Sequence, residues 1–405
     1  MIKLTAYDNR EHFVERYIQD KFSKIQKKCN KMDVQRREYF KYLFPEAFTG
    51  NMLNKVFFSD LLSTNLYKVI EKYPSVKVYY EIVFFSSLDI NNICRKLTMK
   101  QAANIREIYY NRFLKKSGSC GGQIISDYKK YCLPTKDLNT YICKSSENFI
   151  EFQKFIKKNF IDKSQISKTR KRYGILKNIF DYKTMVNSTD RNEIVNNLNM
   201  IVCPYCNRAY ISSFKDPWSE DEERTSADLD HFFSKKQFIL FSLSLYNFVP
   251  CCKVCNSLFK GDKNMDILYP YIDAYEKKVK FTLIDNNKIV AAKDVYGWSR
   301  GKQIDIAYID TRDSAMVRQI EREIQLFRIR DVYQIHNEFA ERLLYSKNVL
   351  GERTKREILE CINKGLEKEL ETTEFDKFYY GFDIRRVEDE YKSVPLAKLI
   401  HDIIK

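Results

Sequence analysis

Four cysteines form the most specific chemical pattern in the chain, because they occur as two CxxC pairs. Cys203 and Cys206 make the first pair, and Cys252 and Cys255 make the second. Two thiolates on a tight CxxC turn can face one ion, and two such turns supply the four sulfur ligands that tetrahedral zinc prefers. Cys251 adjoins Cys252, but only Cys252 keeps the two-residue spacing. The pattern therefore predicts a structural zinc site.

Two other interpretations of these cysteines remain open, namely a redox-active CxxC and reduced thiols in a hydrophobic core. A redox site would need one pair rather than two, and it would lie in a thioredoxin-like βαβ unit, which the sequence does not contain.

The long segment between the two pairs contains a histidine in a polar, strand-like context. The segment Asp228-Leu229-Asp230-His231 is followed by Asn247, and Asn256 comes directly after the last cysteine of the pairs. Hydrolysis of a phosphodiester needs an activated water and neutralisation of charge on the phosphate. An imidazole can take a proton from water near neutral pH, so His231 is the predicted general base.

Taken together, these residues resemble the motif of HNH endonucleases of the ββα-metal type, in the variant that a zinc ion staples. The resemblance covers about residues 200–264. It rests on the DxDH segment, on the YNxxP(x)CxxCN segment that ends at Asn256, and on the trailing KGD of Lys260, Gly261 and Asp262. The fold that it implies is a β-hairpin followed by a helix, with the catalytic metal between them.

The resemblance also implies roles for individual side chains. Asp230 and Asn256 would supply oxygen ligands to a catalytic Mg²⁺ or Mn²⁺, which prefers such donors. Asn247 would orient the histidine rather than touch the metal. Lys260 lies four residues after Asn256 on the same helix face and could contact phosphate. Asp228 shares the strand face of Asp230, and it is either a partner of the metal ligands or a solvated acid.

The predicted function is a metal-dependent endonuclease that cleaves DNA. The long helical flanks resemble those of bacterial defence-type HNH proteins, such as the nuclease subunits of Septu-like and retron-associated systems. Those subunits work beside an ATPase, and a partner chain would have to supply one here, because this sequence has no GxxxxGK[ST] motif. Two alternatives remain, a non-catalytic zinc-dependent nucleic-acid-binding or scaffold protein and an RNA- or tRNA-cleaving toxin.

The elements around this motif predict a mostly α protein with a small α+β core. Residues 1–195 form a basic, mostly helical region, residues 196–270 the nuclease domain, and residues 271–405 a second mostly helical region. Amphipathic spacing predicts helices over 11–28, 99–114, 313–349, 352–371 and 394–404. The β-branched and aromatic run Val76–Phe85 favours a strand.

Charge is distributed unevenly along the chain. The formal net charge is +16, and residues 1–200 carry 37 basic and 20 acidic side chains against 33 and 34 in residues 201–405. An excess of positive charge on one part of a chain suggests a polyanion partner, so the first half is expected to bind DNA, or RNA. The basic stretch Ser164–Lys177 could bind phosphates or form a solvated helix face.

No stretch of the sequence is predicted to cross a membrane. The longest uncharged run near the middle, Gln237–Cys252, contains Asn247 and Pro250 and is shorter than the roughly 20 apolar residues that a span needs. The first residues show no apolar signal core before their charges. The expected compartment is therefore the cytoplasm.

Overall fold

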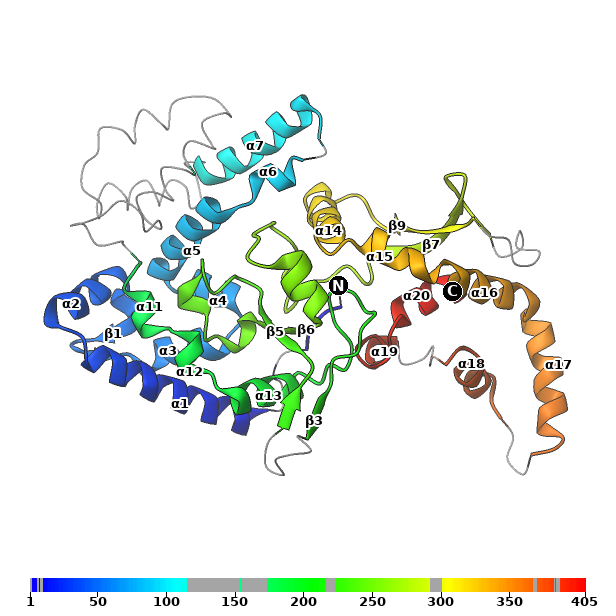
Figure 1. Ribbon diagram of the computed structural model, residues 1–405, viewed down its shortest axis with the longest axis horizontal. Helices are drawn as coiled ribbons and strands as arrows, with labels where there is room; N and C mark the ends of the chain where they lie inside the picture. Colours follow the sequence, from blue (N-terminus) through cyan, green and yellow to red (C-terminus); the bar gives the residue numbers. More distant parts are fainter. Residues whose placement is uncertain are drawn as a thin grey trace.

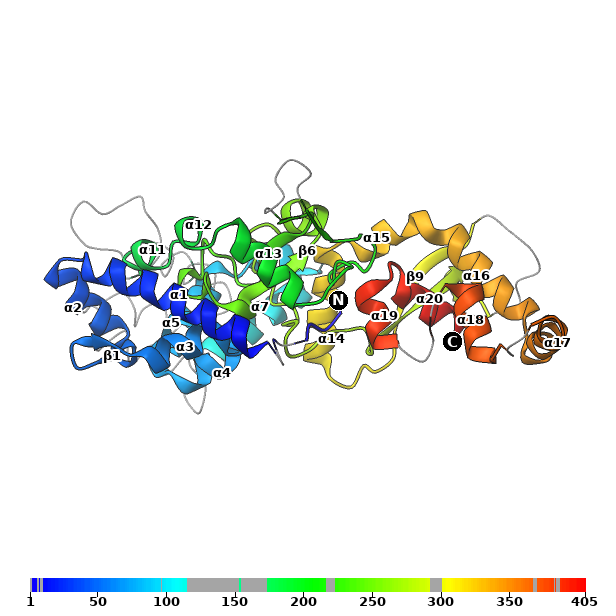
Figure 2. The same ribbon diagram turned by 90° about the horizontal axis from the view of Figure 1, so that it is seen from below.

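The computed structural model describes residues 2–5, 7, 10–95, 97–114, 153, 173–215, 223–291, 301–366, 370–381, 383 and 387–405. Over these residues the protein is mostly helical with small antiparallel sheets, as the sequence predicts. The molecule is elongated, with the first helices at one end, α17 and α18 at the other, and strands β5 and β6 between them (Figures 1 and 2).

Amphipathic spacing correctly predicts two helices of the first region. Helix α1 (Glu11–Asn30) buries Phe13, Tyr17 and Ile25 on one face, and α7 spans Met99–Leu114. The other elements of this region are α2 (Val34–Leu43), η1 (Pro45–Ala47), β1 (Phe48–Thr49), β2 (Met52–Leu53), α3 (Lys55–Ser63), α4 (Leu66–Lys72), α5 (Pro74–Ser87), α6 (Ile90–Ile93), α11 (Leu176–Ile179), α12 (Tyr182–Met185) and α13 (Ser188–Asn197).

The strand predicted over Val76–Phe85 is wrong, because these residues lie inside helix α5. Pro74 occupies the first turn, where a missing N–H leaves no helical hydrogen bond unmade. Most side chains of α5 are buried around its whole circumference, as in a helix enclosed by a core. Packing from all sides thus overrides the strand preference of β-branched and aromatic residues.

The central region carries two antiparallel strand pairs. Strand β3 (Ser213–Lys215) pairs with β4 (Glu223–Thr225), and β5 (Asp228–His231) pairs with β6 (Phe248–Cys251). Two 3₁₀ turns, η3 (Ile239–Phe241) and η4 (Leu245–Asn247), lie in the connection between β5 and β6. A π-helix, η5 (Val254–Lys260), follows β6 and completes an order of two strands and a helix.

The C-terminal region contains a three-stranded sheet besides its helices. Its strands lie in the order β8–β7–β9, with β7 at Val279–Asp285, β8 at Lys288–Ile289 and β9 at Gln303–Tyr308. The helices are α14 (Ser314–Leu326), α15 (Ile329–Tyr333), η7 (Gln334–His336), α16 (Asn337–Val349), α17 (Glu352–Asn363), α18 (Thr372–Tyr380), α19 (Val387–Ser393) and α20 (Ala397–Ile404). The last helix was predicted from residue 394 and begins three residues later.

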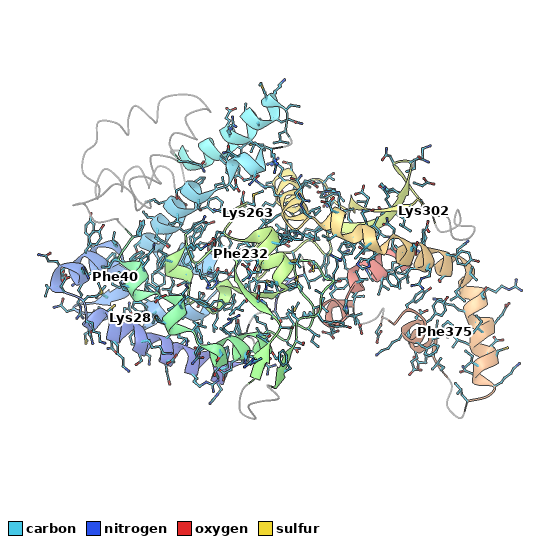
Figure 3. All side chains as sticks on the ribbon, in the orientation of Figure 1. Lys28, Phe40, Phe232, Lys263, Lys302 and Phe375 are labelled. Atoms are coloured by element: carbon cyan, nitrogen blue, oxygen red, sulfur yellow. The ribbon has the colours of Figure 1, made fainter. Side chains whose placement is uncertain are left out.

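Apolar side chains of all three predicted regions join one continuous hydrophobic cluster. Phe40 and Phe232 belong to the first and central parts of the molecule, and Phe375 lies at its far end (Figure 3).

In the described part of the chain, no helix is long and apolar enough to cross a membrane. Most of the basic stretch Ser164–Lys177, residues 164–172, lies outside the described residues.

Candidate functional site

The two CxxC pairs come together in the structure, as their spacing predicts. The sulfur atoms of Cys203, Cys206, Cys252 and Cys255 all lie within 4.8 Å of one another, and three of the four residues are buried. Cys251 is buried on strand β6 outside this group. Four convergent thiolates are the donor set of a structural zinc site, so the cluster can hold such a metal.

Local backbone structure explains why the first pair forms a tight turn. The N–H of Asn207 donates to the carbonyl of Cys203 (2.8 Å), and the N–H of Cys203 donates to the carbonyl of Ala209 (2.9 Å). Asn207 itself has φ +50°, a conformation that asparagine tolerates better than most residues. Its side chain donates to the carbonyl of Tyr391 and accepts from the N–H of Lys398. The cysteine turn is thereby joined to the C-terminal helices α19 and α20.

The second pair connects strand β6 to the π-helix. Cys252 directly follows β6, and Cys255 lies in the first turn of η5. A metal held by all four thiolates would tie the segment before β5 to the start of η5. Such a metal would thereby fix η5 against strand β5, which carries Asp228, Asp230 and His231.

His231 is held in a defined orientation at the end of β5. Its Nε2 lies 3.1 Å from the carbonyl oxygen of Ser242, and only 4% of the residue is exposed. A carbonyl can only accept, so Nε2 carries the proton and Nδ1 keeps the lone pair of the neutral ring. The rings of Tyr182 and Phe248 pack edge-on against the imidazole at 4.5 and 5.0 Å.

The surroundings of His231 favour the neutral imidazole. Burial lowers the pKa of His231 well below its ordinary value, and the positive charge of Lys235 acts in the same direction. The charges of Lys260 and Arg191 add to this effect. The ring is therefore uncharged throughout the neutral pH range.

Asp230 is buried and has a partner on each oxygen. Tyr205 donates its hydroxyl to Oδ2 (2.7 Å), and Lys260 donates its ammonium to Oδ1 (3.0 Å). Lys260 is 1% exposed and also donates to the carbonyl of His231 (2.8 Å). Contrary to the prediction of a phosphate contact, its ammonium points into the protein and neutralises Asp230.

Asn256 lies beside Asp228 rather than Asp230. Its Nδ2 donates to Oδ2 of Asp228 at 3.0 Å, so Asp228 contacts a residue that the resemblance gives as a metal ligand. Asp228 and Asp230 lie two residues apart on β5, so their side chains share one face of the strand. That face thus presents two carboxylates to the π-helix, which contributes the amide of Asn256, and these are oxygen donors of the type that Mg²⁺ binds.

Asn247 braces the connection that follows His231. It is fully buried; its Oδ1 accepts from the N–H of Phe233 (2.8 Å), and its Nδ2 donates to the carbonyls of Phe233 and Phe241 (3.0 Å each). This geometry orients the loop on which the histidine depends, the role that the resemblance implies for Asn247.

The KGD segment clamps the same loop from the other side. Asp262 accepts from Ser234 (2.8 Å) and pairs with the ammonium of Lys236. Gly261 adopts φ +51° between Lys260 and Asp262, a conformation in the region that favours glycine. Lys260 therefore contacts β5, Asp262 contacts the loop after it, and the turn at Gly261 joins the two residues.

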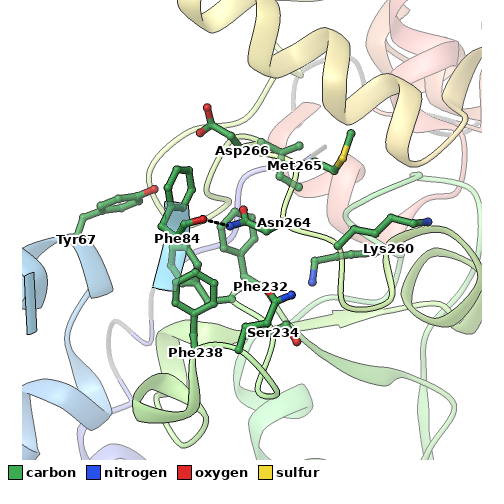
Figure 4. A pocket seen from close by; sticks show the side chains of 13 residues that line it. Tyr67, Phe84, Phe232, Ser234, Phe238, Lys260, Asn264, Met265 and Asp266 are labelled. Atoms are coloured by element: carbon green, nitrogen blue, oxygen red, sulfur yellow. Dashed lines mark hydrogen bonds between the residues drawn. The ribbon is translucent and has the colours of Figure 1, made fainter. Parts of the chain in front are cut away.

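A small cavity separates this clamp from the N-terminal helices. It measures about 20 Å³, room for about one water molecule, and Phe84, Phe232, Ser234 and Lys260 are among its walls (Figure 4). Asn264 spans the gap by donating to the carbonyl of Phe84 at 3.1 Å. Such a cavity cannot hold a substrate, so it is a packing feature.

Comparison with known proteins yields no relative: no protein-family model, curated protein or solved structure matches the chain. The interpretation of the site therefore rests on its residues and their geometry.

Several residues of the site were missed by sequence reasoning. Tyr205 was visible only as part of the first CxxC, and Tyr182, Arg191 and Lys235 stand in no motif. Their positions beside Asp230 and His231 arise from tertiary packing, which no spacing in the sequence signals. Asp262 stood in the KGD segment, where its role in holding the loop could have been suspected.

Proposed function

We propose that this protein is a metal-dependent endonuclease of the HNH type that hydrolyses phosphodiester bonds in DNA. The observation that supports this most strongly is the state of His231. Its Nε2–H is directed at the carbonyl of Ser242, and burial keeps the ring neutral, so that Nδ1 is available as a base. A fixed, neutral imidazole on the residue that follows Asp230 along β5 is suited to take a proton from water.

In this proposal each side chain has one task. His231 accepts the proton of the attacking water at Nδ1, and Asn247 keeps the loop around the imidazole in place. Asp228, Asp230 and Asn256 would hold a Mg²⁺ or Mn²⁺ ion, which supplies charge neutralisation at the phosphate. Lys260 shares Asp230 with that ion and holds β5 against the π-helix.

The four cysteines have a structural task in the same proposal. With zinc bound, the turn at Cys203 and Cys206 and the start of η5 form one rigid unit. Tyr205 lies within this turn and connects it to β5 by its hydrogen bond to Asp230.

The resemblance to bacterial defence nucleases extends the proposal to a cellular context. The protein would act in the cytoplasm as the effector of an anti-phage or restriction-type system, together with a partner chain that hydrolyses ATP.

A second function, a zinc-stapled nucleic-acid-binding protein without catalysis, is favoured by one observation. Asp230 and His231 are each 4% exposed, and both oxygens of Asp230 already have partners. Residues so enclosed can serve the fold alone. A third, cleavage of RNA in place of DNA, uses the same chemistry and differs only in substrate.

One experiment separates these three functions. The full-length protein is incubated with supercoiled plasmid and with total RNA, each in Mg²⁺, in Mn²⁺ and in EDTA. The proposal predicts nicked or linear plasmid with either metal and intact plasmid in EDTA. Degradation of RNA alone would replace DNA by RNA as the substrate, and binding without any cleavage would favour the non-catalytic protein.

A further inference from the structure

Three cationic side chains from separate elements lie near one another beside Tyr182, the residue whose ring packs against His231. Lys183 lies on α12, Arg191 on α13, and Lys235 in the loop after β5. The ammonium of Lys235 lies 4.3 Å from the ring centroid of Tyr182, and this ring also packs against the imidazole of His231 at 4.5 Å. Tyr182 of α12 thus brings the N-terminal region into contact with the predicted catalytic residue.

Acidic side chains act on these three charges only from a distance, because Asp262 and Asp230 raise the pKa of Lys235 without pairing with it. Among the described residues, none of the three forms an ion pair within 4.0 Å. The acidic neighbours are engaged elsewhere: Asp190 pairs with Lys21 (2.7 Å), and Asp262 pairs with Lys236. Within the same part of the chain, Nε of Arg191 is buried without a hydrogen-bond partner.

Holding these cations together is unfavourable in the free protein. Burial lowers the pKa of Lys235, and the charges of Arg191 and Lys183 lower it further. A buried donor without a hydrogen-bond partner is unfavourable as well. An anion bound among these side chains would relieve both the repulsion and the missing hydrogen bond.

We propose that Lys183, Arg191 and Lys235, here called the cationic cluster, bind a phosphodiester of the nucleic-acid backbone next to His231. A guanidinium matches two phosphate oxygens with its planar fork, and the two ammonium groups add point charges. The inference rests on the proposed endonuclease function, because the neighbouring base would act on that phosphodiester. Binding by the cluster can nevertheless be measured without cleavage.

The test measures binding of the full-length protein to a 12-base-pair DNA duplex in EDTA, by fluorescence anisotropy over a range of KCl concentrations. Each phosphate contact contributes about 0.9 to the slope of log Kd against log salt. The double variant Arg191→Gln/Lys235→Gln should bind more weakly and lose about 1.8 from this slope, and Lys235→Gln alone about half of that. An RNA duplex of the same length shows which nucleic acid the cluster prefers.

The matched control is Lys236→Gln. It removes the same charge from the neighbouring residue, but this lysine is exposed and already paired with Asp262, so the slope should stay at the wild-type value. Thermal melting of each variant shows that the fold is kept.

The outcomes separate this inference from the proposed function. If the double variant shows a reduced slope but the wild-type protein cleaves nothing with Mg²⁺ or Mn²⁺, the result supports the cluster and refutes the endonuclease. An unchanged slope in a protein that does cleave refutes the cluster alone. Failure of the wild-type protein to bind either duplex overturns the inference as well.

Discussion

Replacing Lys260 by methionine tests whether the buried pair with Asp230 holds the site together. The side chains of Lys260 and Asp230 are 2% and 4% exposed, and the ammonium makes hydrogen bonds to Asp230 and to the carbonyl of His231. Lys260→Met removes the charge but keeps much of the apolar stem. It leaves a carboxylate buried without its counter-charge, which costs about 3–5 kcal/mol of unfolding free energy.

The pair between Lys236 and Asp262 provides the matched control. Its side chains are 73% and 45% exposed, so Lys236→Met should cost no more than about 1 kcal/mol. Urea unfolding followed by far-ultraviolet circular dichroism measures both values. In the background of Asp230→Asn no carboxylate is left for Lys260→Met to strand, so this substitution should then cost less, by a coupling energy of about 0.5–3 kcal/mol.

A loss below about 1 kcal/mol for Lys260→Met, equal to that of the exposed pair, would refute this reasoning. It would mean that the ammonium lies in solvent. Lys260 would then be available for the phosphate contact that the sequence suggests.

Three other predictions concern the metal, the pH dependence and the loop. Elemental analysis should find about one zinc per chain in the wild type and in Cys251→Ser, but little in Cys206→Ser. Equal zinc content in all three proteins would refute the four-cysteine zinc site. Burial raises the pKa of Glu323 on α14 from 4.5 to about 8, so the folded state keeps a proton that the unfolded state releases. The stability of the wild type relative to Glu323→Gln should fall as pH rises from about 4.5 to 8, by at most about 1.4 kcal/mol per pH unit, and parallel curves would contradict this. Asn247→Ala should lower the free energy of unfolding by about 1–3 kcal/mol for each buried group that loses its partner, and a loss near zero would show that the loop is held by other contacts.

The sequence predicts those parts of the structure that depend on local spacing. The four cysteines converge because each CxxC is a local turn, and helices α1 and α7 follow from apolar residues at helical intervals. The strand predicted over Val76–Phe85 is wrong because the burial that decides between strand and helix comes from distant segments.

The residues of the candidate site also divide into those that local spacing indicates and those that only tertiary packing brings together. His231, Asn247 and the buried Asp230 could be selected from the DxDH and YNxxP segments. The inward direction of Lys260 could not, because its contacts with Asp230 and with the carbonyl of His231 arise only in the tertiary structure. Arg191 and Lys235 reach His231 from elements that only the tertiary structure brings together.

The central claim is that His231 acts as a general base, and His231→Ala tests it most directly. Plasmid cleavage in Mg²⁺ is measured for the wild type, for His231→Ala and for His12→Ala, which removes an exposed histidine on α1. A positioned general base contributes about 10²–10⁴-fold to the rate, so His231→Ala should lose that factor while zinc content and DNA binding stay at the wild-type level. Cleavage by His231→Ala within about tenfold of the wild type, and equal to that of His12→Ala, would contradict the assignment.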